Sequence, residues 1–216
     1  MARALLLLVL ALGLWAQRRL PADREAFAAA ERLPAPAARI AAYEKFLNDF
    51  PESPQAYSAR RAIFEETVRL HRSDRGKVMS TAHALLKGVA PNDYGRLATA
   101  IAAQLHEEKL FPKDALGFAQ KAVAAPGTAQ RRAGAADTLG QIYRRAGDLK
   151  NATRWLRRAL VDDPAMASSA TALGEMAASA LEAAAYFAQA RLAGPDPAAI
   201  AQLDESGARP TRRWLG

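Results

Sequence analysis

The chain has 216 residues, of which 50% are hydrophobic and 24% are charged, and it contains no cysteine. This composition is typical of a globular protein, and it excludes disulfides, thiol nucleophiles and cysteine-based metal centres. Alanine accounts for 53 residues, whereas valine and isoleucine together account for 11. Because alanine favours helices and the β-branched residues that favour strands are scarce, an all-β fold is excluded and an all-α fold is expected.

The first 16 residues have the layout of a secretory signal peptide. Arg3 precedes an apolar stretch from Ala4 to Trp15, and Ala16 is a small residue suited to cleavage. A membrane span needs roughly 20 apolar residues, and this stretch is shorter. We therefore expect cleavage after Ala16 and a periplasmic or secreted protein without a stable transmembrane span, with a retained segment as the alternative.

Beyond this segment, apolar residues recur at helical spacing, and prolines, glycines and polar residues interrupt them. Paired segments of this length with tight joining turns are typical of helical repeats. The spacing predicts helices over 22–33, 36–49, 54–71, 75–88, 93–109, 113–125, 129–146, 148–162, 166–178, 180–193 and 198–204.

The clearest repeat spans residues 133–166. Small residues stand where two helices would cross, and larger apolar residues stand where they would fill the space between them. The residues expected to pack this repeat are Leu139, Gly140, Tyr143, Gly147, Ala152, Leu156, Ala159 and Pro164. Their spacing resembles the tetratricopeptide repeat, which has an L-G-x2-Y motif followed by A-x3-F and P.

Weaker copies of this pattern occur over 167–197, 94–126 and 36–64, whereas 54–91 has the length of a repeat but few of its residues. The segment from Tyr43 to Pro54 is similar to repeats in bacterial outer-membrane assembly and envelope-coordination proteins. The resemblance as a whole is to an exported bacterial tetratricopeptide repeat protein. It implies a right-handed superhelical solenoid of four to five antiparallel helical hairpins over 22–197, followed by a short helix and tail over 198–216.

The sequence offers no recognisable catalytic or metal-binding motif. The three histidines, His71, His83 and His106, are far apart, and there is no G-x-S-x-G nucleophile motif, phosphate loop or dinucleotide fingerprint. We therefore expect a protein that is not an enzyme and that needs no cofactor or metal.

The whole chain has a formal net charge of +8. Much of its positive charge is concentrated in one part of the sequence. An ordinary solvated helix face is one interpretation, and a surface that meets carboxylates or phosphates is the other. The basic patch comprises Arg131, Arg132, Lys150, Arg154, Arg157 and Arg158.

The resemblance further implies a concave groove that holds a protein or peptide. The positions that would face this groove are Asp137, Gln141, Arg144, Arg145, Thr171 and Glu175. The expected function is that of a non-catalytic protein-binding scaffold of the cell envelope. Two alternatives stay open: a basic protein that contacts anionic envelope polymers or, less expectedly for an exported chain, nucleic acid, and an accessory module of a larger envelope assembly or redox system.

Overall fold

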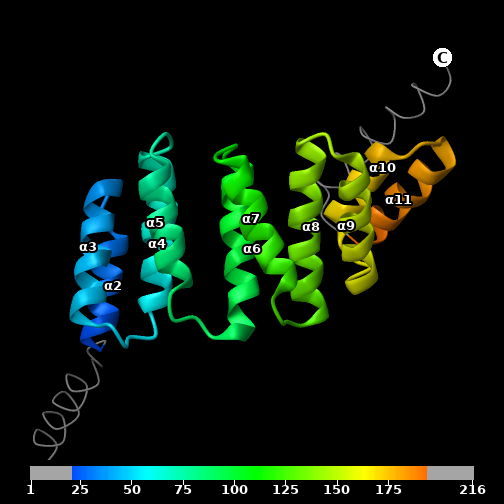
Figure 1. Ribbon diagram of the computed structural model, residues 1–216. Helices are drawn as coiled ribbons and strands as arrows, with labels where there is room; N and C mark the ends of the chain where they lie inside the picture. The colour runs from blue at the N-terminus through cyan, green and yellow to red at the C-terminus, as the bar shows by residue number, and fades with distance from the viewer. Residues whose placement is uncertain (1–20, 194–216) are drawn as a thin grey trace, which may run out of the picture. The chain divides into compact units, whose positions relative to one another are not determined.

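The computed structural model describes residues 21–193, and every regular element in that range is an α-helix (Figure 1). The all-α fold class is therefore confirmed for these residues. The predicted signal peptide and the predicted helix over 198–204 lie outside them. The helices are α2 (Ala22–Glu31), α3 (Pro36–Asp49), α4 (Ala56–Leu70), α5 (Arg75–Leu86), α6 (Pro91–Glu107), α7 (Pro112–Ala124), α8 (Ala129–Arg145), α9 (Leu149–Asp162), α10 (Ala167–Met176) and α11 (Ala180–Ala193).

Local sequence signals explain where several helices begin. Pro36, Pro91 and Pro112 lie in the first turns of α3, α6 and α7, where a missing N–H removes no helical hydrogen bond. Thr128 and Asp148 cap α8 and α9, because their side chains accept hydrogen bonds from the backbone N–H of the third residue of each helix, Arg131 and Asn151. Pro36 was the predicted start of its helix, whereas Pro91 and Pro112 were predicted to precede the helices that in the structure include them.

The chain divides into two compact units, one ending at Leu85 and the other beginning at Leu86. In the N-terminal unit, aromatic side chains of α2 and α3 form the centre of a buried cluster. The ring of Phe27 lies 5.4 Å from that of Tyr43 and 5.6 Å from that of Phe46, measured between centroids. Ala59 and Ile63 of α4 pack against the same cluster, so three helices share one core.

In the C-terminal unit, each helix packs against its neighbours along the chain. The helix α6 contacts α7 and α8, α8 contacts α9 and α10, and α10 contacts α11. Ala98, Ala122 and Ala135, from α6, α7 and α8, meet in a buried cluster. Small side chains allow these helix axes to approach closely, so the alanine-rich composition produces a helical, repeat-like arrangement.

Two glycines mark the closest approaches between paired helices. A Cβ atom on Gly140 of α8 would lie 2.6 Å from Cγ of Leu156 on α9. A Cβ atom on Gly174 of α10 would lie 2.7 Å from Cε1 of Phe187 on α11. Real Cβ atoms do not approach other atoms so closely, so a side chain at either position would require the side chain of Leu156 or Phe187, or the helix that carries it, to move.

The turns that end α6 and α8 have the same hydrogen bonds but different residues. Each helix ends with a residue in the left-handed conformation, Lys109 (φ 57°) after α6 and Gly147 (φ 80°) after α8. The following N–H groups donate to the carbonyl groups of Leu105 and Tyr143, as in a Schellman motif. Glycine adopts the left-handed conformation at no steric cost, whereas for a residue with a Cβ atom this conformation raises the free energy of the folded protein by about 1 kcal/mol. The α6–α7 turn is therefore strained.

Within residues 21–193, no helix combines the length and the apolar character that crossing a membrane requires.

Candidate functional site

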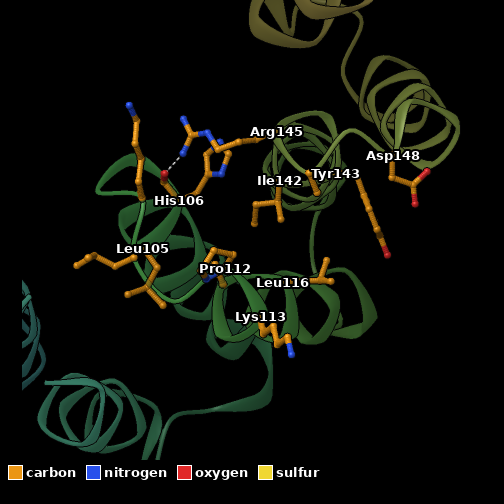
Figure 2. A pocket seen from close by; sticks show the side chains of 13 residues that line it. Leu105, His106, Pro112, Lys113, Leu116, Ile142, Tyr143, Arg145 and Asp148 are labelled. Carbon is orange, nitrogen blue, oxygen red and sulfur yellow. Dashed lines mark hydrogen bonds between the residues drawn. The ribbon is translucent and has the colours of Figure 1, made fainter. Parts of the chain in front are cut away.

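A cleft of about 400 Å³ lies in the C-terminal unit, between the end of α6, the start of α7 and the end of α8. Its floor is apolar. The apolar side chains that line it include those of Leu105, Pro112, Leu116 and Ile142 (Figure 2). A concave, largely apolar surface with a few charged groups is the usual form of a binding site.

The rim of the cleft carries charge. Its cations are Lys109, Lys113 and Arg145, and its carboxylate is Asp148. Lys113, Arg145 and Asp148 are labelled in Figure 2. Hydrogen bonds from the side chain and backbone of Asn151 lower the pKa of Asp148, so this group is ionised at neutral pH. The three cations exceed the single anion, and the rim therefore favours a ligand with negative charge.

The strained α6–α7 turn forms one edge of the cleft. Lys109 and Phe111, the two described non-glycine residues with positive φ, lie on either side of Leu110, which lines the cleft. The backbone carbonyl of His106 accepts hydrogen bonds from the Lys109 N–H (3.2 Å) and from Nη1 of Arg145. Arg145 of α8 is thus hydrogen-bonded to the end of α6 at the rim of the cleft. The turn places Lys109 beside the apolar floor.

His106 is held neutral at the edge of this cleft. Burial lowers its pKa to about 4, and the positive charges of Arg145 and Arg144 act in the same direction. The imidazole therefore adds no positive charge to the rim at neutral pH.

This low pKa predicts a pH-dependent loss of stability that depends on His106. The unfolded chain binds a proton at this residue below a pH of about 6.5, whereas the folded chain binds it only near 4. Stability from this group is therefore complete above pH 6.5 and falls as the pH is lowered toward 4. We expect His106→Gln to reduce the difference between the free energies of unfolding measured by urea at pH 7 and at pH 4.5. Equal pH dependence in both proteins would contradict this assignment.

Most of the predicted groove residues lie where α8 faces α10. The side chain of Ser169 donates to Oδ1 of Asp137 at 2.6 Å, and Nε2 of Gln141 lies 3.4 Å from the same oxygen. Arg144 forms an ion pair with Glu175. These polar side chains therefore join α8 to α10. Thr171 is half-buried and donates to the carbonyl of Ala167 in its own helix.

The structure places Arg145 elsewhere. It was expected to face the same groove as Arg144, but it donates to the carbonyl of His106 and lines the cleft. The reason is geometric, since consecutive helix positions point in directions about 100° apart. Arg145 therefore lies apart from the other predicted groove residues, and its role in binding a partner stays a prediction.

The residues expected to pack the 133–166 repeat occupy three environments. Five are buried, namely Leu139, Gly140, Ala152, Leu156 and Ala159. Gly147 and Pro164 are exposed at the turns after α8 and α9. Tyr143 differs from the expectation that it fills space between α8 and α9. It is half-buried and lines the cleft, and its hydroxyl accepts a hydrogen bond from Nε2 of Gln120 on α7.

The basic patch divides into a groove and its surroundings. Arg132, Arg154, Arg157 and Arg158 line a second concavity, of about 510 Å³, beside α9. Arg131 instead donates to the carbonyl of Asn92 at 2.8 Å, and Lys150 is exposed at the start of α9.

The cleft has almost no signature in the sequence by which it could be predicted. In the sequence its apolar residues have the spacing of ordinary core positions. Its edge depends on a left-handed turn without glycine, and no local sequence motif predicts such a turn. The one available signal was the length of the segment between Lys109 and Lys113, which is slightly long for the repeat. In the described part of the chain, no group of three or more histidine, aspartate and glutamate side chains could hold a metal ion.

Neither the models of known protein families nor the sequences of curated proteins match this chain.

Proposed function

We propose that this protein is a non-catalytic scaffold of helical hairpins that binds a protein or peptide partner, and that the cleft is its contact site. The observation that carries the proposal is the apolar floor beneath a cationic rim at the ends of α6, α7 and α8. The floor suits large apolar side chains, and the rim suits acidic groups beside them.

We further propose that the hairpins are tetratricopeptide-like and form a right-handed solenoid. Supporting this, Leu139-Gly140 and Leu173-Gly174 lie 34 positions apart, which is the length of that repeat. Both glycines stand against a large side chain of the following helix, Leu156 or Phe187. The glycine thus recurs at the interval of the repeat and its large partner after 31 positions, so the same kind of contact joins each pair of helices, as expected of stacked repeats.

Location in the cell envelope is part of the proposal. It is supported by the charged residue Arg3, the apolar stretch from Ala4 to Trp15 and the small residue Ala16.

The cleft can be tested by selecting peptides from a displayed random library on the full chain. We expect the selected peptides to carry large apolar side chains. Synthetic copies should bind the Leu116→Asp variant at least about tenfold more weakly than the unmodified chain, because the charge in the floor loses its hydration when the peptide binds. Leu181→Asp is the matched control, since Leu181 is 84% exposed on α11 and does not line the cleft. Circular dichroism would verify that both variants fold.

Two results would contradict the proposed site. One is a selection that yields no binding peptide. The other is a set of peptides that bind Leu116→Asp and Leu181→Asp with the same affinity as the unmodified chain.

A further inference from the structure

The arginine groove is a second concavity of the C-terminal unit, lined chiefly by α9. We use this name for the surface formed by Arg132, Arg154, Trp155, Arg157, Arg158 and Val161. Its volume is about 510 Å³. It is separate from the cleft, because the two concavities share no lining residue and take different parts of α8.

Two of its arginines share one carboxylate. Asp162 has a side chain only 7% exposed and accepts hydrogen bonds from Arg132 at 2.9 Å and Arg158 at 2.9 Å. The hydrogen bond from Arg132 lowers the pKa of Asp162, and Arg158 acts in the same direction. Arg132 also donates to the carbonyl of Gly127, whereas Arg158 uses only its Nε in these contacts. The two Nη groups of Arg158 are therefore available to a ligand.

The other two arginines differ in how many of their donors are already used. Arg157 donates to the hydroxyl of Tyr186 and to Glu182. Arg154 forms no ion pair within residues 21–193, and its guanidinium lies 5.6 Å from the centre of the Trp155 ring. Four guanidinium groups thus face two carboxylates, and the groove keeps a net positive charge.

Apolar surface lies directly beside these cations. Val161 is 73% exposed, and Val123 and Ala136 line the same groove next to Trp155. A phosphate polymer would gain little from such a surface. Nucleic-acid strands generally stack on open aromatic faces, but the groove has a single tryptophan, half-buried and in contact with Arg154. Paired carboxylates and a neighbouring aliphatic side chain match the groove better, because guanidinium forks bind carboxylates bidentately.

We propose that the arginine groove binds an acidic protein segment, with carboxylates on Arg154 and Arg158 and an aliphatic side chain against Trp155 and Val161. The proposal rests on the scaffold function only in taking a protein as ligand, since it uses different residues from the cleft. It gives the protein two contact surfaces joined by α8.

The probe for this proposal is a fluorescein-labelled peptide of about 14 residues in which Glu alternates with Leu, measured by fluorescence anisotropy with the full chain. We expect binding that Arg154→Glu weakens about tenfold or more, as removal of charged hydrogen bonds predicts. Lys150→Glu is the matched control. It makes the same change of charge one turn away on α9, outside the groove, and we expect a loss of less than about threefold.

Comparison probes separate the remaining outcomes. Binding is measured in the Leu116→Asp background, which removes any contribution from the cleft, and replacing Glu by Gln in the peptide should abolish it. The proposal is overturned if the peptide does not bind in this background, or if Arg154→Glu and Lys150→Glu weaken its binding equally. Tighter binding of an oligothymidine of equal length, with a steep dependence on salt, would assign the groove to nucleic acid instead. A failure confined to the cleft peptides would reject the proposed function and leave the groove intact.

Discussion

Replacing Gly140 by alanine is expected to destabilise the protein by about 1–2 kcal/mol. The new methyl group would lie 2.6 Å from Cγ and 3.1 Å from the backbone nitrogen of Leu156. Because one of these atoms belongs to the backbone of α9, a side-chain rotation alone cannot relieve the overlap, and overpacking of this kind costs about 1–3 kcal/mol or more. The higher helix propensity of alanine, about 1 kcal/mol, offsets only part of it.

Gly134→Ala is the control on the same helix. A Cβ atom on Gly134 would meet nothing within 4 Å, so this substitution should stabilise the protein by about 0.5–1 kcal/mol through helix propensity alone. Urea unfolding monitored by circular dichroism gives both values. If Gly140→Ala were as stable as Gly134→Ala, α8 and α9 would not approach as closely as described.

Removing Arg39 is expected to cost about 3 kcal/mol, through the carboxylate that it leaves behind. Nε and Nη2 of Arg39 donate to Oε1 of Glu66 at 3.0 Å and 2.6 Å, and Nη1 donates to the carbonyl of Leu33 at 2.9 Å. Glu66 is buried, and its Oε2 has no hydrogen-bond partner in the described structure. Arg39→Ala would leave this carboxylate with only Arg69, at 3.4 Å. Breaking a buried ion pair from one side costs about 3–5 kcal/mol.

Two comparisons test this explanation. Arg61→Ala breaks the more exposed pair between Arg61 and Glu65 on α4 and should cost only about 0.5 kcal/mol. Arg39→Met combined with Glu66→Leu removes both charges and should recover most of the lost stability. Hydrogen exchange in α3 and α4 reports the N-terminal unit directly. A loss for Arg39→Ala no larger than for Arg61→Ala would show that Glu66 does not depend on Arg39.

The helices were predictable because their ends are encoded locally. The predicted segments 129–146 and 148–162 differ from α8 and α9 by a single residue at one end of each. The signals there are strong, since Thr128 and Asp148 accept capping hydrogen bonds and Gly147 adopts the left-handed conformation. Where such residues occur, the position of a helix depends little on the rest of the fold.

The cleft was not predictable by the same means. Its edge depends on Lys109 and Phe111, which adopt positive φ values although neither residue type favours them. Only tertiary contacts, such as the hydrogen bond from Arg145 to the carbonyl of His106, distinguish this turn from an ordinary helix end. Such a contact joins residues far apart in sequence and leaves no local pattern.

The stretch of sequence that holds the candidate contact residues was predictable, but the way in which their side chains form a surface was not. The sequence indicated that α8 and α9 carry an unusual concentration of arginine, and four of these arginines line one groove. Their partners could not be foreseen, because Asp162 and Glu182 read as ordinary charged positions. Which guanidinium groups remain available depends on these carboxylates, and hence on the packing of α9 against α8 and α11.

The contacts of the C-terminal unit also determine how it would respond to mechanical load. The helix α11 packs mainly on α10, and α10 packs on α9 and α8. A force applied to α11 would therefore detach the α10–α11 hairpin before it separated Gly140 from Leu156. Extension in an optical trap would then proceed in successive steps, each releasing one pair of helices, rather than in one concerted rupture.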